Sequence, residues 1–338
     1  PIIGNRSFGS EVQNVVNSAL AYSNGLQDNR IIAAIKHFPG HGDTSTDSHL
    51  DLPVVAHNLD RLNAVELAPF KALMDKGIGG VMVAHLYVPA LEKENGIPAS
   101  ISKNIITGLL KEKFGYKGLI ITDALNMGAV DKRYKPGELD ALAFKAGNEI
   151  MLFSEGVKEG KRLIQQAIDN REISQNRIEE SVKKILLTKY FLGLDKYEPR
   201  NPENINYDLN NDSHKTLVQN LYANALTLLK DNKKLLPLNC RENYYYVPLE
   251  EAAYQTFSDR LNLETTVIVK KSSEISSIPK NSKVIVGFHK DNSTAYKSYK
   301  ISDKSKKILS ELSKNNQVIL TVFGSAYALK DVDISNIL

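Results

Sequence analysis

Residues 36–53 read KHFPGHGDTSTDSHLDLP and gather three histidines, three aspartates and two glycines directly after an apolar run. Side chains of these types rarely fill a core, so we expect the segment to line an active site. Its triplet Asp47-Ser48-His49 places a carboxylate two residues from an imidazole, where it can orient the ring and stabilise its charged form. The first hypothesis is a proton-transfer pair.

Asp123 offers a second reactive group, because it ends the apolar run of GLIITDALNM. A lone aspartate after a strand is often only the cap of the next helix. However, a carboxylate nucleophile opposite a separate proton donor is the arrangement that retaining glycoside hydrolysis requires. On this hypothesis Asp123 is the nucleophile, and His49 gives a proton to the leaving oxygen and later takes one from water. Asp47 would hold the imidazole of His49.

Three further side chains are candidates for binding the oxygens of a neutral sugar. Lys36 and His37 end a strand with hydrogen-bond donors, and Arg6 offers a planar fork that can grip vicinal oxygens. A solvated lysine and a surface arginine are the alternatives for Lys36 and Arg6. His85, at the end of GVMVAH, is more typical of a hydrogen-bonded core histidine than of a catalytic group.

The same loop has a rival interpretation as a metal site. Its candidate ligands are His37, His41, Asp43, Asp47 and His49. The two histidines of His-x3-His are separated by Pro39 and Gly40, so they cannot share a helix face as metal-binding histidines do in HExxH sites. No glutamate or cysteine completes the set within the loop. We therefore predict no metal and no cofactor, and Gly40 and Gly42 are expected to allow a tight loop beside a ligand.

The elements that must position these groups follow a βα pattern. Four near-continuous apolar runs predict buried parallel strands at Ile31–Ile35, Gly79–Ala84, Leu119–Thr122 and Ile150–Phe153. Three of them end in a polar or ionisable residue, on the edge where barrels and open parallel sheets place their chemistry. Helices are predicted between them at 66–76 and 103–114, each followed by glycine, and a longer helix is predicted after Ser174.

The segment EPRNPEN at 198–204 reads as a linker. We predict a catalytic domain over residues 1–200, a linker and helix over 201–222, and the start of a second α/β domain over 223–338. Strands are expected there at 225–230, 283–288 and 317–323. This second part has no cluster of catalytic residue types, which favours a role in packing or assembly.

The composition limits the class of protein. With 42% hydrophobic and 24% charged residues, the chain is an ordinary globular one rather than disordered, and its apolar runs are too short for a membrane span. The 43 basic and 39 acidic residues are spread along the chain, so no nucleic-acid partner is indicated. The single cysteine, Cys240, forms no internal disulfide and is expected to be at least partly buried.

These motifs together resemble glycoside hydrolase family 3, in its β-N-acetylhexosaminidase branch. KHFPGHGDTSTDSHLDLP is similar to the histidine loop of that branch, IITDALNM to its nucleophile strand, and the segment from Pro1 to Gly9 to its substrate-arginine segment. The resemblance continues through AFKAGNEIMLF and RIEESVKKILLTKYFLGL and covers residues 1 to about 195. The segment ALTLLKDNKKLLPL is similar to the start of the family's C-terminal α/β sandwich domain.

The resemblance implies that Asp123 is the nucleophile, His49 the general acid/base and Asp47 its partner, with Arg6, Lys36 and His37 binding N-acetylglucosamine. It implies a metal-free retaining enzyme that releases terminal β-linked N-acetylglucosamine from peptidoglycan fragments or related oligosaccharides. The fold implied is the last four strands of a TIM-type (β/α)8 barrel followed by part of an α/β sandwich.

The family's first half barrel has no counterpart here, so this chain alone is expected to be inactive. Glu149 stands where the family more often has aspartate, and its role is expected to be structural. A metal-dependent hydrolase, a non-catalytic sugar-binding protein and phosphorolysis remain as alternatives. The compartment stays open, with a bacterial exported or periplasmic location favoured over the cytoplasm.

Overall fold

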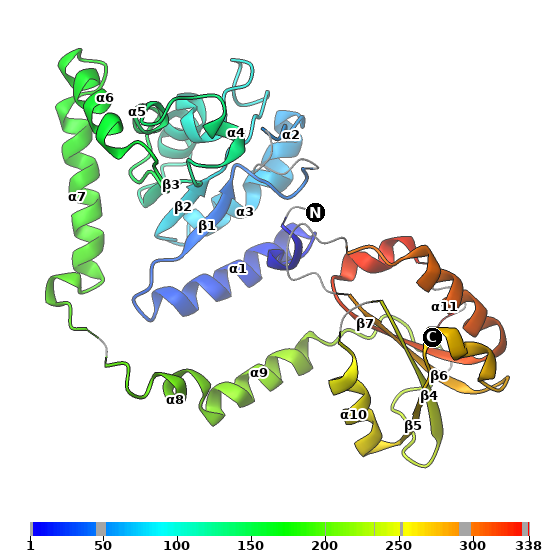
Figure 1. The fold of residues 1–338 in the computed structure, drawn as a ribbon. Coiled ribbons are helices and arrows are strands. Elements are labelled where there is room, and N and C mark those ends of the chain that lie inside the picture. Colours follow the sequence, from blue (N-terminus) through cyan, green and yellow to red (C-terminus); the bar gives the residue numbers. More distant parts are fainter. Residues whose placement is uncertain are drawn as a thin grey trace. The chain divides into compact units, whose positions relative to one another are not determined.

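The computed structural model of the chain describes residues 3–44, 52–199, 201–232, 234–250, 253–290, 299–332 and 337. The chain divides into two compact units, residues 1–198 and 199–338 (Figure 1). Each unit contains one parallel sheet with helices packed on it, which confirms the predicted α/β class.

The first unit contains a three-stranded parallel sheet of order β1-β2-β3, formed by Ala34–Phe38, Gly80–Val83 and Leu119–Thr122 (Figure 1). The third strand has the predicted bounds, whereas the first begins three residues later than predicted and includes Lys36 and His37. Val81, Val83 and Ile120 lie on one face of the sheet and are fully buried, whereas Met82 and Ile121 on the other face are only partly buried. The predicted fourth strand is reduced to an isolated bridge between Ile121 and Ile150.

Helical segments precede, connect and follow these strands. They are η1 Gly4–Arg6, α1 Val12–Gln27, α2 Leu59–Arg61, η2 Leu62–Glu66, α3 Leu67–Met74, η3 Ala99–Ile101, η4 Asn104–Lys113, α4 Gly128–Asp131, α5 Glu138–Ala146, α6 Val157–Asp169, α7 Gln175–Phe191 and η5 Leu194–Lys196. The predicted glycine stops are confirmed: Gly77 and Gly115 have φ of 81° and 67°, a conformation that favours glycine. The Ser174 hydroxyl caps α7 by accepting from the Arg177 amide.

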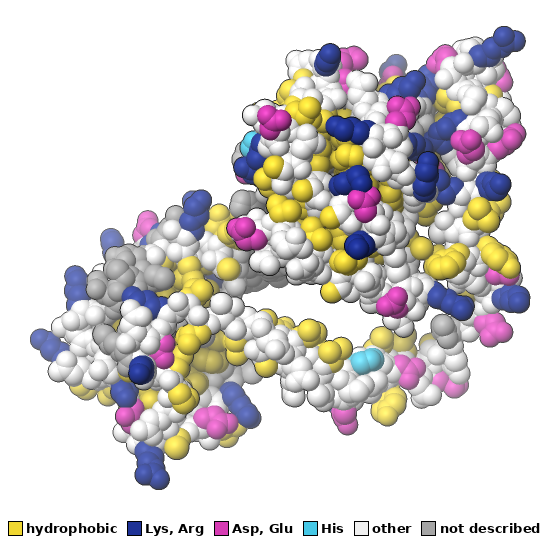
Figure 2. Space-filling model, turned by 180° about the vertical axis from the view of Figure 1, so that it is seen from behind, with side chains coloured by type: hydrophobic (Ala, Val, Ile, Leu, Met, Phe, Trp, Pro, Cys, Tyr) yellow, Lys and Arg dark blue, Asp and Glu magenta, His cyan; other side chains and the backbone are white. Residues whose placement is uncertain are grey.

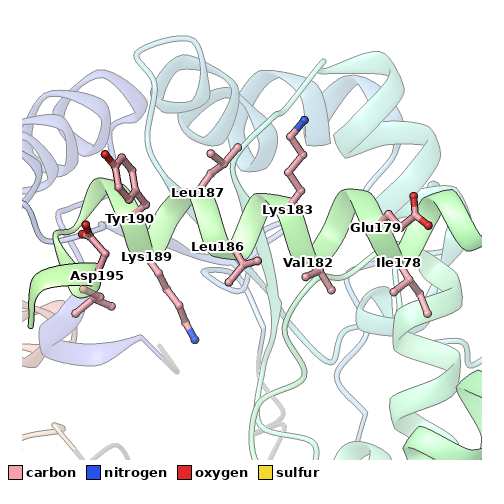
Figure 3. A pocket seen from close by; sticks show the side chains of 10 residues that line it. Ile178, Glu179, Val182, Lys183, Leu186, Leu187, Lys189, Tyr190 and Asp195 are labelled. Carbon is pink, nitrogen blue, oxygen red and sulfur yellow. The ribbon is translucent and has the colours of Figure 1, made fainter.

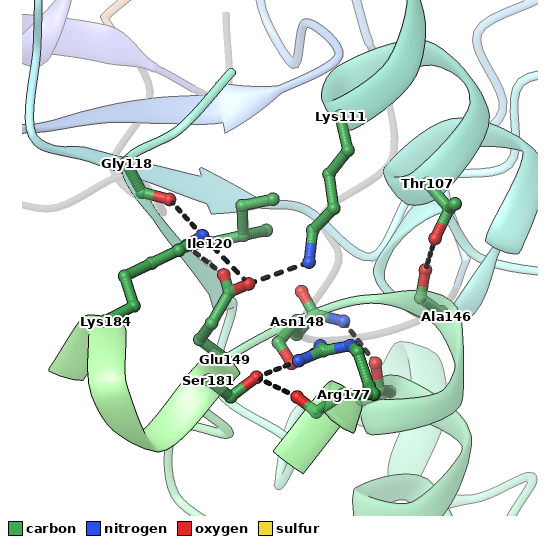
Figure 4. A network of polar contacts seen from close by, with 11 residues as sticks. Thr107, Lys111, Gly118, Ile120, Ala146, Asn148, Glu149, Arg177, Ser181 and Lys184 are labelled. Carbon is green, nitrogen blue, oxygen red and sulfur yellow. Dashed lines mark hydrogen bonds and ion pairs between the residues drawn. The ribbon is translucent and has the colours of Figure 1, made fainter. Parts of the chain in front are cut away.

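Glu149 ties α7 and η4 to strand β3 (Figure 4). Its side chain is 2% exposed, and its Oε1 accepts from Lys111 Nζ at 2.7 Å and from Lys184 Nζ at 3.1 Å. Its Oε2 accepts from the Ile120 amide at 2.9 Å. The carboxylate thus accepts a hydrogen bond from a backbone amide near the start of β3. This agrees with the structural role expected for Glu149.

The outward face of α7 is apolar and exposed. Val182, Leu186 and Tyr190 are 48%, 58% and 68% exposed, and Ser181 is the only buried residue among those described in this helix. These side chains line a groove together with Ile178 and residues of η5 (Figure 3). The described residues that line the groove belong to α7 and η5 and include none of the candidate site residues.

The second unit contains a four-stranded parallel sheet of order β5-β4-β6-β7 (Figure 1). Its strands are β4 Asn243–Leu249, β5 Thr266–Val269, β6 Lys283–His289 and β7 Gln317–Phe323. Its helical segments are α8 Ile205–Asn210, α9 Asp212–Ala225, α10 Gln255–Glu264, η6 Ser272–Ser277, α11 Asp303–Asn315 and η7 Ala326–Asp331. The predictions of β6, β7 and a helix near 213–222 are confirmed.

Two predictions for the second unit are wrong. Residues 225–230 form no strand; Leu226, Leu228 and Leu229 are 82%, 66% and 65% exposed, so their apolar alternation has no partner to bury it. Cys240 is exposed rather than buried. It lies in the irregular segment before β4, where no element covers it.

Charged side chains of both signs are interspersed on the face of the molecule that Figure 2 shows, and no broad field of one sign stands out there. Among the described helices, none has the length and apolar character that a bilayer crossing requires.

Candidate active site

The candidate site lies at the carboxyl ends of β1, β2 and β3, which meet at one edge of the sheet because the strands are parallel. Asp123 follows β3 directly, and its amide donates to the Val83 carbonyl of β2 at 2.8 Å. Parallel pairing therefore carries the Asp123 side chain to the same edge as His37 of β1. The predicted proximity of groups from two strand ends is found.

Asp123 and His37 face each other across this edge. The distance from His37 Nε2 to Asp123 Oδ2 is 3.9 Å, which is too long for a hydrogen bond and leaves the carboxylate oxygen accessible to a reacting atom. The other oxygen, Oδ1, accepts from the Ala124 amide at 2.9 Å. The Asp123 side chain is 14% exposed. Such a carboxylate is held by one oxygen and can attack with the other.

The ladder between β1 and β2 explains why His37 reaches the site. Ala34 and Ile35 pair with Gly80 and Val81, but Phe38 pairs with Val83, so two residues of β1 stand opposite one residue of β2. The two residues are Lys36 and His37. A bulge of this kind re-aims side chains, and here the His37 ring is buried while Lys36 is exposed.

His37 is neutral over the physiological pH range. Burial lowers the pKa of its imidazole to about 4, and the positive charges of Lys36 and Arg6 and the His41 ring act in the same direction, against the opposing effect of Asp123. The ring is 8% exposed and stands edge-on to His41 at 5.8 Å. Its Nδ1 is buried without a hydrogen-bond partner among the described residues.

This buried neutral histidine predicts a pH dependence of stability. Between pH 6.5 and about 4 the unfolded chain binds a proton at residue 37 and the native chain does not, so the free energy of unfolding should fall as the pH is lowered. The loss should reach roughly 2 to 3 kcal/mol near pH 4. His37→Asn should remove this component, as measured by urea unfolding at pH 7 and at pH 4.5.

His214→Asn is the matched control, because His214 is an exposed histidine on α9. This variant should keep the pH dependence of the wild type. Parallel curves for the wild type and His37→Asn would contradict a depressed pKa at residue 37.

Of the other predicted site residues, the structure describes Arg6 but not Asp47 or His49. Arg6 ends η1 with an exposed side chain whose Nε donates to the Ile3 carbonyl at 3.3 Å, and its charge acts on His37. Asp47 and His49 lie outside the described residues, so the proton-transfer pair stays a prediction.

The described members of the proposed metal set diverge. His37 faces Asp123, His41 Nδ1 is 2.7 Å from Thr44 Oγ1, and Asp43 Oδ2 is 2.9 Å from His57 Nε2. No metal site is formed by the described members of that set.

Asp43 belongs to a cluster that sequence reasoning missed. One oxygen or nitrogen atom from each of Asp43, His57 and Glu66 lies within 4.8 Å of the others. Arg61 supplies a cation there, with Nη2 at 3.2 Å from Glu66 Oε1 and 3.9 Å from Asp43 Oδ2. A Cβ on Gly40, whose φ is 139°, would lie 2.8 Å from Glu66 Cβ. The cluster and this close contact hold the start of the histidine loop against η2. No motif in the loop pointed to its partners at 57–66.

Comparison with known proteins supports the family resemblance of the sequence motifs. Residues 1–188 match the family described as glycosyl hydrolase family 3 N terminal domain. The beta-hexosaminidase A of Pseudoalteromonas piscicida is 32% identical over 74% of this chain and 44% of its own length. The beta-hexosaminidase of Neisseria meningitidis serogroup C is 37% identical over 45% of this chain and 41% of its own length.

A solved structure is also similar. It is a glycoside hydrolase family 3 beta-N-acetylglucosaminidase from Paenibacillus sp. str. FPU-7, which is 28% identical, matches with a TM-score of 0.76, and covers 98% of this chain and 66% of its own. The chain thus spans less than half the length of the two curated relatives. The family match extends over more than half of the chain and includes both strand ends of the candidate site. This chain belongs to glycosyl hydrolase family 3.

Proposed function

We propose that the protein containing this chain is a retaining β-N-acetylglucosaminidase that hydrolyses terminal β-linked N-acetylglucosamine. The observation that carries the proposal is the Asp123 carboxylate at the end of β3, with one oxygen bound to the Ala124 amide and the other facing His37 at 3.9 Å. The names of the relatives, beta-hexosaminidase and beta-N-acetylglucosaminidase, support the sugar class. Peptidoglycan fragments or related oligosaccharides are the proposed substrates.

In the proposed reaction Asp123 attacks the anomeric carbon while the bond from that carbon to the aglycone oxygen breaks. His49, oriented by Asp47, gives its proton to the departing oxygen. In the second step His49 takes a proton from water, the water oxygen attacks the anomeric carbon, and Asp123 leaves. Neutral His37 provides a binding group that adds no positive charge beside the nucleophile. Arg6 and Lys36 are proposed to bind hydroxyl oxygens of the sugar.

The test is hydrolysis of 4-nitrophenyl β-N-acetylglucosaminide by the full-length protein, with the α-anomer and the β-glucoside as controls. Proton NMR should show the β-anomer of N-acetylglucosamine as the first product. The α-anomer appearing first would exclude a glycosyl-enzyme at Asp123, and binding without turnover would favour the non-catalytic alternative. Added phosphate separates hydrolysis from phosphorolysis, because only phosphorolysis yields the sugar 1-phosphate. Full activity after exhaustive chelation is expected, and its loss would favour the metal-dependent alternative.

A further inference from the structure

Ala124 is the residue after the proposed nucleophile, and both its backbone amide and its backbone carbonyl form hydrogen bonds to side chains. The Ala124 amide donates to Asp123 Oδ1 at 2.9 Å, and the Ala124 carbonyl lies 2.9 Å from His85 Nε2. The first contact fixes which oxygen of Asp123 is engaged and leaves Oδ2 toward His37. The position of Ala124 therefore sets the rotamer of the carboxylate.

His85 is itself rigidly held. It follows β2 by two residues, is fully buried, and has its Nδ1 at 2.7 Å from Ser100 Oγ. A carbonyl oxygen can only accept a hydrogen bond, so Nε2 of His85 carries the hydrogen that binds Ala124. In the neutral ring Nδ1 then accepts from the Ser100 hydroxyl. The two partners define both the tautomer and the plane of the ring.

Ser100 is fixed in turn by two neighbouring segments. It is fully buried, and its amide donates to the Ala84 carbonyl at 3.2 Å. The Asn148 side-chain amide donates to the Ser100 carbonyl at 2.9 Å, and Asn148 is fully buried as well. Hydrogen bonds thus run from Asn148 through Ser100, His85 and Ala124 to the Asp123 carboxylate. The side chains of Asn148, Ser100 and His85 are fully buried, and Ala124 is partly buried.

We propose that His85 is a positioning residue for the nucleophile: through its Nε2 bond to the Ala124 carbonyl it holds the Asp123 carboxylate in the attacking orientation. It touches no substrate in this role. The inference rests on the proposed function, because it assigns His85 a part in the glycosylation step at Asp123. A displacement of about 1 Å at a reacting atom can lower a rate by about 100-fold, so loss of this bond should be visible in kinetics.

Two conservative variants separate the effects of the two hydrogen bonds that the His85 ring forms. The side-chain amide of His85→Gln reaches the position of Nε2 and can still donate to Ala124, whereas His85→Asn reaches only the position of Nδ1 and keeps the Ser100 contact. Each variant loses one hydrogen bond from the same buried site. In the full-length protein we expect kcat/KM of His85→Gln within about 3-fold of wild type and that of His85→Asn lower by about 10- to 100-fold.

Two readouts distinguish positioning from a purely structural role. The inhibition constant of free N-acetylglucosamine and the melting temperature should be similar in the two variants, because neither variant alters a group proposed to bind the sugar. Equal kcat/KM values for the two variants would overturn the proposal, as would losses in kcat/KM that simply follow the melting temperature. Absence of hydrolysis by the wild type contradicts the proposed function, whereas hydrolysis by the wild type with no difference between the variants contradicts the role of His85 alone.

Discussion

Replacing Asp123 by alanine should lower kcat/KM for an aryl β-N-acetylglucosaminide by about 10⁴-fold or more, because the variant lacks the proposed nucleophile of the covalent intermediate. The described surroundings of Asp123 offer no substitute carboxylate, since its near contacts are the His37 ring and the Ala124 amide. Steady-state kinetics of the full-length protein measures the effect. Binding of N-acetylglucosamine should change far less than turnover, because the nucleophile acts in the transition state.

Asp131→Ala is the matched control. Asp131 is an exposed aspartate at the end of α4, eight positions after Asp123, and its replacement should leave kcat/KM at the wild-type value. A variant of Asp123 that keeps wild-type turnover would remove the nucleophile from the proposed mechanism.

A second variant tests the chemical role rather than the residue. Asp123→Gly leaves space on the face of the sugar from which the carboxylate attacks, so azide can displace the aryl oxide from the anomeric carbon in its place. The product should be the α-glycosyl azide, with turnover restored in proportion to azide concentration. A β-glycosyl azide would show attack from the opposite face and would assign Asp123 a different role.

The bounds of the third strand of the first unit could be predicted because local pattern and topology agree there. The run Leu119–Thr122 is apolar, short and bounded by Gly118 and Asp123, and it forms β3 with the predicted bounds. Once three such strands are parallel, their carboxyl ends must share an edge, so the sequence predicts that the segment after the first strand and Asp123 lie at the same edge.

Other features depend on partners that no local pattern reveals. The bulge at Lys36 and His37 is a property of the pairing between β1 and β2, and the segment at Ile150 pairs with β3 only through a bridge. The leucines at 226–229 have the pattern of a strand but pair with no strand among the described residues and are exposed. The hydrogen bonds of His85 join residues up to 39 positions apart, so its burial could be expected but its link to Ala124 could not.

Glu149→Gln should destabilise the first unit by about 2 to 4 kcal/mol. The charge is nearly fully buried, and its removal leaves the ammonium groups of Lys111 and Lys184, 24% and 28% exposed, without their counter-charge. Burial lowers the pKa of Lys111, and the hydrogen bond and negative charge of Glu149 oppose that lowering, so the charged form of Lys111 is favoured by this carboxylate. The amide of Ile120 would also face a side-chain NH₂ in place of an acceptor oxygen in one of the two amide orientations.

The effect should be local, because Glu149 connects β3 to α7 and η4. Hydrogen exchange of peptides covering Leu119–Thr122 should speed up more than exchange in β4 and β6 of the second unit. The urea concentration at the midpoint of unfolding of the first unit should fall. Glu172→Gln provides the matched control: it breaks the ion pair with Lys145 between side chains that are 48% and 37% exposed. Exposed pairs contribute little because water and salt screen them, so this variant should unfold almost as the wild type does. If the two variants shift the urea midpoint equally, then the buried carboxylate contributes no more than a surface ion pair, and the attachment of α7 must depend on other contacts, such as the Arg177 guanidinium that lies 4.5 Å over the Phe144 ring.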